Sequence, residues 1–133
     1  MKEVGTNRTA NKDVGDAGEA RALAHLLQHG LALVERNYRV AGGPHARGGE
    51  IDLILREHDG TLVFVEVRSR RSALFGGAGA SVGAVKQRRL VLAAQHFLRR
   101  YRSMPPCRFD VIALQGDGAT GRIEWLRGAF DAS

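Results

Sequence analysis

The chain has 133 residues, 44% of them hydrophobic, and its 20 basic and 14 acidic residues give a formal net charge of +6 at pH 7. This length and apolar content suit one domain with a single hydrophobic core. The positive charge favours a polyanionic partner, above all nucleic acid, although many basic proteins have none. The single cysteine, Cys107, excludes an internal disulfide and a cysteine-rich zinc site.

The N-terminal segment is polar and lacks the apolar core of a signal peptide. No apolar run approaches the ~20 residues of a membrane span, so we expect a cytoplasmic protein with no membrane partner. We predict a mobile polar tail over residues 1–14, then a helix over residues 16–29 that ends at Gly30. The folded domain is expected over residues 15–128, with a C-terminal tail over residues 129–133.

Glu19 has two interpretations within this helix. Asp16 and Glu19 have the spacing of a capping box, in which Glu19 would only satisfy backbone donors at the helix start. Glu19 also shares a helical stripe with Leu23, Leu26 and Leu27, which should face the sheet. The two roles are compatible, so both stay open.

Three strands should follow the helix. The first is predicted over residues 31–40, and the segment 41–49, with four glycines and a proline, reads as a loop. The next two strands form a hairpin over residues 50–68. In this hairpin, Asp52 and Glu66 each interrupt a run that otherwise reads as a buried strand. Burying an unpaired charge costs roughly several kcal/mol, so such a group is usually paired, protonated or bound to a metal.

The apolar pattern selects the register of this hairpin. Placing Asp52 opposite Glu66 gathers the apolar side chains on one continuous face, namely Ile51, Leu53, Leu55, Val63, Val65 and Val67. A slip by one residue would set each carboxylate against an apolar side chain. The favoured register also requires a three-residue loop over residues 58–60, in which Gly60 is free to adopt a positive φ.

The other face of the hairpin would carry Glu50, Asp52, Glu66 and Arg68. Directly opposed strand residues have Cβ atoms ~5 Å apart, and two carboxylates that close repel each other unless a cation lies between them. Hard ions prefer oxygen ligands, so the pattern predicts Mg²⁺ or Mn²⁺ at Asp52 and Glu66. Arg68 returns to the same face and places a positive charge beside the metal.

The rest of the chain completes an α/β fold. The glycine-rich segment 75–83 is expected to be mobile, and a second helix is predicted over residues 84–102, ended by Met104-Pro105-Pro106. A strand over residues 109–114 should run parallel to the preceding one, because a helix crosses over between them. An edge strand is predicted over residues 122–126. The predicted order is an α-β-β-β-α-β core, a mixed sheet flanked by helices.

Several motifs together resemble the YraN-like family. Asp52, followed by Glu66-Val67-Arg68, resembles the PD-(D/E)xK nuclease signature, whose last position is usually lysine. The other motifs are Gly18-Glu19, Gly49-Glu50-Ile51-Asp52-Leu53-Ile54, Phe64-Val65-Glu66-Val67-Arg68-Ser69-Arg70, Phe75-Gly76, Ser81-Val82, Lys86 and Arg108-Phe109-Asp110-Val111-Ile112. Over residues 16–126 the chain is similar to this family of small bacterial proteins, which are grouped with Holliday-junction resolvases and predicted to be endonucleases.

The resemblance implies a restriction-endonuclease-like fold and a metal-dependent endonuclease that hydrolyses phosphodiester bonds in DNA, with branched DNA as one candidate substrate. It implies Glu19 as a third acidic residue, because related nucleases carry a helix-borne glutamate at the metal site. Related resolvases act as dimers, which leaves a homodimer open. The candidate catalytic residues are Glu19, Asp52, Glu66, Arg68 and Lys86, of which Glu19, Asp52 and Glu66 are the candidate metal ligands.

Arg68 is the main departure from the nuclease signature. Arginine keeps its proton in proteins, so Arg68 is able to stabilise negative charge but not to act as a base. Lys86 is the only lysine in the predicted folded domain, because the other two, Lys2 and Lys12, lie in the predicted tail. Lys86 begins an inward-facing stripe of the second helix, where it is either an active-site cation or a lysine that extends toward solvent.

Four more arginines are candidates for phosphate contacts, namely Arg70 and Arg71 after the hairpin and Arg88 and Arg89 on the second helix. One alternative to the nuclease is a catalytically impaired nucleic-acid-binding protein on the same fold, impaired through Arg68. Another is a basic interaction module whose buried acids are all salt-bridged. Metal-dependent cleavage separates the first two hypotheses, and failure to bind nucleic acid would favour the third.

Overall fold

The computed structural model describes residues 3–42, 48–70, 82–116 and 121–131, without the side chains of residues 3–15 and Arg70. In chain order the elements are α1 (Glu3–Gln28), β1 (Ala32–Val40), β2 (Gly49–Arg56), β3 (Leu62–Arg70), α2 (Ala84–Leu98), β4 (Cys107–Gln115) and β5 (Arg122–Phe130). None of the helices in these ranges is long and apolar enough to cross a membrane.

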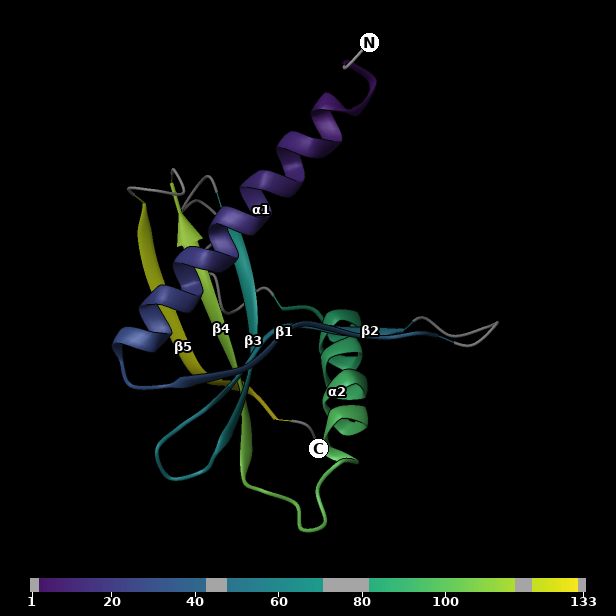
Figure 1. The fold of residues 1–133 in the computed structure, drawn as a ribbon, viewed down its shortest axis with the longest axis vertical. Helices are drawn as coiled ribbons and strands as arrows, with labels where there is room; N and C mark the ends of the chain where they lie inside the picture. The colour runs from purple at the N-terminus through teal and green to yellow at the C-terminus, as the bar shows by residue number, and fades with distance from the viewer. Residues whose placement is uncertain (1–2, 43–47, 71–81, 117–120, 132–133) are drawn as a thin grey trace.

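The strands form one mixed sheet in the order β1-β2-β3-β4-β5 (Figure 1). β3 and β4 are parallel, and the other neighbours pair antiparallel. The parallel pair is joined through α2, as a crossover connection requires. The α/β class, the α-β-β-β-α-β order and the additional edge strand are therefore confirmed.

The sheet is buried on both faces. On one face α1 packs its Ala22 and Leu26 against Leu53, Val65 and Ile112. On the other face α2 supplies a larger cluster, whose members include Leu90, Ala93, Phe97, Ile54, Phe64 and Val111. This two-sided burial explains why β2 and β3 read as nearly continuous apolar runs. A carboxylate in the middle of such a strand therefore has little access to water.

The predicted hairpin register is correct. β2 and β3 pair as Leu53↔Val65, Ile54↔Phe64 and Leu55↔Val63, the register in which Asp52 faces Glu66. The turn also agrees, since Glu57 and Thr61 are hydrogen-bonded around residues 58–60 and Gly60 has φ +95°.

One detail of the predicted apolar face is wrong. Ile51 packs in the cluster on the α2 side, whereas Leu53, two residues later, packs on the α1 side. On the neighbouring strand Tyr38 pairs with Ile51 and Arg36 pairs with Leu53. Between them Asn37 has φ +52°, a left-handed conformation that breaks the regular alternation of a strand. Asp52 thus lies where β2 changes the face that it presents.

The helix boundaries also differ from the prediction. α1 begins at Glu3 rather than Asp16, so most of the segment predicted as a tail has a helical backbone. α2 ends at Leu98, and the next residues, through Tyr101, continue in tighter turns with i→i−3 hydrogen bonds. β5 extends to Phe130, beyond the predicted strand. Most of the glycine-rich segment predicted to be mobile lies outside the described residues.

Candidate active site

Asp52 lies where β2 and β3 part. The backbone pairing of the two strands runs from Arg56↔Leu62 to Leu53↔Val65. One residue beyond, the carboxylate Oδ2 of Asp52 accepts a hydrogen bond from the backbone N–H of Val67 at 2.8 Å. The Asp52 side chain thus accepts a hydrogen bond from the β3 backbone at the point where the backbone pairing of β2 and β3 ends. This hydrogen bond holds the Asp52 carboxylate beside Glu66.

Glu66 is a buried carboxylate on β3, 5% exposed. Its Oε2 lies 3.2 Å from Nζ of Lys86 on α2. Its other oxygen, Oε1, is buried and has no hydrogen-bond partner in the described part of the chain. Buried polar atoms are almost always paired, so this carboxylate is expected either to share a proton with the neighbouring Asp52 or to bind a cation.

The pKa values of Asp52 and Glu66 are both raised, and burial is the main cause. Burial, reinforced by the negative charge of Asp52, raises the pKa of Glu66 to about 7, although Lys86 opposes the shift. Burial also raises the pKa of Asp52, and the hydrogen bond from Val67 opposes it. The pair therefore favours a single negative charge near neutral pH unless another cation joins it.

Glu19 approaches this pair from α1. Its side chain is 16% exposed and lies 3.9 Å from Nη2 of Arg36 on β1. With its amide nitrogen turned toward Glu19, Asn37 donates to both carboxylate oxygens at 3.2 and 3.3 Å. Burial, followed by the charge of Asp52, raises the pKa of Glu19. The capping interpretation of Glu19 is wrong, because α1 already begins at Glu3.

The stripe expected to carry Glu19 toward the sheet is only partly right. Leu26 is fully buried, but Leu27 is 45% exposed. Gly18 instead lies against the sheet, where an added Cβ would be 3.1 Å from Cδ1 of Leu114. The close approach of α1 at Gly18 brings its neighbour Glu19 near the strands.

The two candidate catalytic cations come from different elements. Lys86 reaches Glu66 from the first turn of α2, so its ammonium group pairs with a buried carboxylate and is not directed only at solvent. Its role as an active-site cation stays a prediction. Arg68 lies on β3, two residues beyond Glu66 and opposite Ala113 of β4. One cation thus belongs to the strand and the other to the crossover helix.

The acidic pair fits a hard divalent ion. Its donors are carboxylate oxygens, and the unpartnered Oε1 of Glu66 is an oxygen that a cation would satisfy. In the described part of the chain, no group of three or more histidine, cysteine, aspartate or glutamate side chains is arranged to hold a metal. Mg²⁺ commonly uses one or two carboxylates and completes its shell with water and substrate phosphates. Asp52 and Glu66 provide the two carboxylates that this mode uses, and metal binding by them and by Glu19 stays a prediction.

The four arginines predicted to bind phosphate differ in their contacts and in whether the structure describes them. Arg89 lies 3.6 Å from Glu50 and donates to the carbonyl of Gly48 at 3.2 Å. Arg88 is exposed and lines a cavity of about 450 Å³ on the outer side of α2, together with Gln87, Val91, Leu92 and Gln95. Arg71 and the side chain of Arg70 lie outside the described residues.

Comparison with known proteins gives the family. The model of the uncharacterised protein family UPF0102 matches residues 18–114, which include every candidate catalytic residue. The chain belongs to UPF0102. This is the YraN-like family that the motifs indicated.

Curated UPF0102 relatives match over most of their length. A UPF0102 protein of Methylibium petroleiphilum is 66% identical over 122 residues, which cover 92% of this chain and 97% of the relative. One of Acidovorax sp. strain JS42 is 65% identical, covering 90% of this chain and 85% of the relative. One of Albidiferax ferrireducens is 52% identical, covering 99% and 98%.

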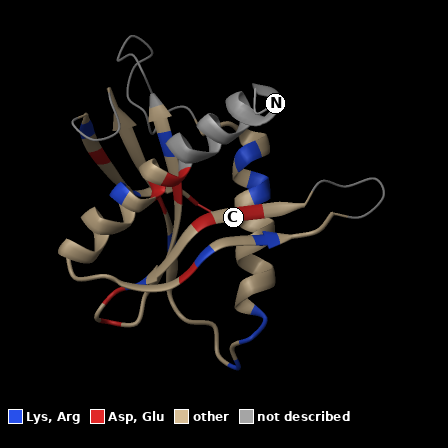
Figure 2. Cartoon of the chain, turned by 45° about the horizontal axis from the view of Figure 1, so that its top comes forward, with Lys and Arg blue, Asp and Glu red and all other residues tan. Residues whose placement is uncertain are grey.

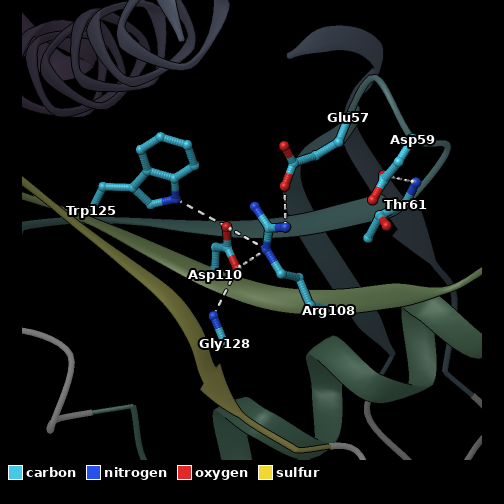
Figure 3. Close-up of polar contacts among 7 residues, drawn as sticks. All are labelled: Glu57, Asp59, Thr61, Arg108, Asp110, Trp125 and Gly128. Atoms are coloured by element: carbon cyan, nitrogen blue, oxygen red, sulfur yellow. Dashed lines mark hydrogen bonds and ion pairs between the residues drawn. The ribbon is translucent and has the colours of Figure 1, made fainter. Parts of the chain in front are cut away.

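A second buried carboxylate in this UPF0102 chain has a different surrounding. Asp110 on β4 is 1% exposed, and Figure 3 shows its donors converging on it. Arg108 Nε lies 3.0 and 3.2 Å from its two oxygens, Trp125 Nε1 donates at 2.9 Å, and the backbone N–H of Gly128 donates at 3.0 Å. Arg108 also pairs with Glu57 beside the hairpin turn. Asp110 is thus salt-bridged to Arg108 on its own strand, and its hydrogen bonds with Trp125 and Gly128 join β4 to β5.

Sequence reasoning missed the polar residues of β1. Arg36 and Asn37 contact Glu19, and Arg39 lies 3.6 Å from Glu50. The available signal was their density, because the segment Glu35-Arg36-Asn37-Tyr38-Arg39 is too polar for an ordinary buried strand. No such pattern predicts which acid each residue contacts, since Glu19 lies on α1 and Glu50 on β2, far from β1 in the sequence.

Proposed function

We propose that this protein is a metal-dependent endonuclease that hydrolyses phosphodiester bonds in DNA, branched DNA included. The observation that carries the proposal is the buried pair of carboxyl groups, Asp52 and Glu66, in which Oε1 of Glu66 meets no donor among the described residues and Lys86 lies beside the other oxygen. A purely structural carboxylate would be expected to have both oxygens satisfied. A Mg²⁺ or Mn²⁺ ion held by Asp52 and Glu66 would supply a Lewis acid that polarises the phosphodiester and lowers the pKa of water.

The chain's own side chains supply the remaining roles. The Val67 N–H fixes one oxygen of Asp52, which orients that carboxylate without a flexible partner. The ammonium group of Lys86 stabilises the negative charge that develops on the phosphate in the transition state. Arg68 contributes in the same electrostatic way, since arginine does not give up its proton. Glu19, held by Arg36 and Asn37, adds an acceptor for an ordered water.

The direct test is cleavage of labelled four-way-junction and duplex DNA in Mg²⁺ or Mn²⁺. We expect the wild type to cut, and the Asp52→Asn, Glu66→Gln double variant to lose cleavage while remaining folded. Glu124→Gln is a matched control, because it removes an exposed carboxylate from β5, at the far edge of the sheet. Failure of the wild type to cut any of these substrates with either ion would contradict the proposal.

A second candidate function is nucleic-acid binding without cleavage. One observation favours it, namely the arginine in place of the signature lysine at position 68. Arg68→Lys tests this alternative. If the wild type binds junctions but does not cut them, and Arg68→Lys restores cutting, the arginine is the cause of the lost activity.

A further inference from the structure

The base of the β1–β2 hairpin packs very closely against α2. An added Cβ on Gly49 would lie 2.4 Å from the carbonyl oxygen of Arg89 and 2.9 Å from the backbone nitrogen of Ala93. Both are backbone atoms, which do not move aside as a flexible side chain would. Only glycine permits this contact, and it brings the next residue, Glu50, beside α2.

Glu50 lies between two arginines. Its Oε2 is 3.6 Å from Nε of Arg39 on β1, and its Oε1 is 3.6 Å from Nη2 of Arg89 on α2. These distances are longer than hydrogen bonds, so the ion pairs are loose. Each guanidinium has five N–H donors. The side chains of Arg39 and Arg89 are 73% and 34% exposed, so both can reach a ligand from solution.

The three side chains line an open groove of about 680 Å³, together with residues 40–42, 48 and 49. The groove adjoins the carboxylate pair in two ways. Glu50 precedes Asp52 by two residues, and its charge acts on Asp52. On α2, Arg89 follows Lys86 by three residues, a spacing that places both on one side of a helix. In Figure 2 the blue stretches in the upper part of α2 lie beside the red and blue stretches of this hairpin.

We propose that the groove formed by Arg39, Glu50 and Arg89 binds a second phosphate of the nucleic-acid strand, next to the phosphodiester held at Asp52 and Glu66. This inference rests on the proposed function. Two guanidinium groups and one carboxylate leave a net charge of +1, which matches one phosphodiester. Glu50 is a positioning residue that holds the two arginines apart, and their remaining donors contact the phosphate oxygens. The substrate is therefore a polynucleotide that extends beyond the cleaved bond, rather than a mononucleotide.

The test is binding of labelled duplex and junction DNA in EDTA, where cleavage does not interfere, at a series of salt concentrations. We expect Arg39→Gln and Arg89→Gln each to weaken binding several-fold and to lower the slope of log K against log salt by about one. Arg122→Gln removes the same charge from an exposed position on β5, at the opposite edge of the sheet. This control should leave the slope unchanged.

Arg89 also donates a hydrogen bond to the carbonyl of Gly48, so its variant alone does not separate the loss of a phosphate contact from local damage to the hairpin. Arg39 is the cleaner position, because it is mostly exposed. Equal effects of Arg39→Gln and Arg122→Gln would overturn the inference in favour of diffuse charge, as would no effect of Arg39→Gln or no binding by the wild type. The slopes are measured without cleavage, so a protein that binds as expected but never cuts would refute only the proposed function. Cleavage with unchanged slopes would refute only this second phosphate site.

Discussion

Asp110 and Glu66 are two buried carboxylates on neighbouring parallel strands, and they differ in how their oxygens are satisfied. Asp110 receives hydrogen bonds from Arg108, Trp125 and Gly128. Glu66 has Lys86 on one oxygen, and beside it only another carboxyl group, Asp52, with no donor among the described residues for the other oxygen. The difference teaches how to separate a carboxylate that joins strands from one that is arranged for a ligand. Burial alone does not separate them.

Removal of the satisfied carboxylate should have the largest effect on stability. Asp110→Ala leaves Nε of the partly buried Arg108 and the Trp125 and Gly128 donors without their acceptor, although Arg108 keeps its pair with Glu57, so we expect the free energy of unfolding to fall by about 3 kcal/mol. Glu66→Gln, measured in EDTA at pH 8, should leave stability unchanged or higher, because it removes a charge that burial disfavours. Urea unfolding of both variants measures the contrast. Equal losses would mean that Glu66 is as structural as Asp110.

The pH dependence of stability should also differ. The folded-state pKa of Glu66 is about 7, above its ordinary value of 4.5, so the folded state keeps the proton that the unfolded state releases. The free energy of unfolding should therefore fall as pH rises from 4.5 to 7, by at most about 3 kcal/mol.

The measurement for this prediction is the difference between wild type and Glu66→Gln in urea unfolding, in EDTA, from pH 4.5 to 8. The difference cancels the titration of all other groups that the variant leaves unchanged. Glu124→Gln serves as the control and should parallel the wild type. A difference that grows in the wild type's favour as pH rises would reverse the predicted sign.

Divalent ions should restore the stability of the folded state that is lost when Glu66 ionises. At an ion concentration one hundred times the dissociation constant, binding to the folded state alone adds about 2.7 kcal/mol. We expect Mg²⁺ or Mn²⁺ to raise the melting temperature of the wild type more at pH 8 than at pH 5, since the ligands must lose their proton. Asp52→Asn and Glu66→Gln should lose the effect and Trp125→Phe should retain it. An increase that survives both acidic substitutions would place the ion elsewhere.

The smallest effect concerns one bond of the satisfied carboxylate. Trp125→Phe removes the indole N–H that donates to Asp110 but keeps an aromatic ring, and Arg108 and Gly128 still satisfy the acid. We expect a loss of about 1.5 kcal/mol, the usual contribution of a hydrogen bond to a charged group. Chemical unfolding measures it, with Phe130→Leu on the same strand as a control for altered aromatic packing. A loss as large as that of Asp110→Ala would show that the indole dominates the network.

The strand register was predictable because it depends on local alternation. Apolar residues on two short segments fixed the pairing of Leu53 with Val65, and the length of the turn agreed. The approach of Lys86 to Glu66 was partly predictable, because a helical stripe sets its direction but not its distance. The same reasoning failed at Ile51, which packs on the α2 side where it pairs with Tyr38, next to the left-handed residue Asn37 of β1.

Contacts between distant segments were beyond such patterns. The indole of Trp125 and the carboxylate of Asp110 meet because β5 lies beside β4, and nothing in either segment encodes the other. The pairing of Glu50 with Arg39 and Arg89 depends on the close packing of Gly49 against α2, a fit that is visible only in three dimensions. The start of α1 at Glu3 was not predicted, because the first residues of this helix are too polar to indicate a buried face.

The hydrogen bond from Val67 to Asp52 turns one backbone amide into a spectroscopic probe of the site. Most amides of the β3–β4 ladder are bonded to other peptide groups, whose electronic state does not change with ions or pH. The Val67 amide is bonded to a carboxylate that gains or loses charge. Its NMR resonance would therefore follow events at Asp52 in solution while its ladder neighbours act as internal references. Binding of a ligand near Asp52 would therefore shift the Val67 amide resonance, and this shift is measurable without an assay for a reaction product.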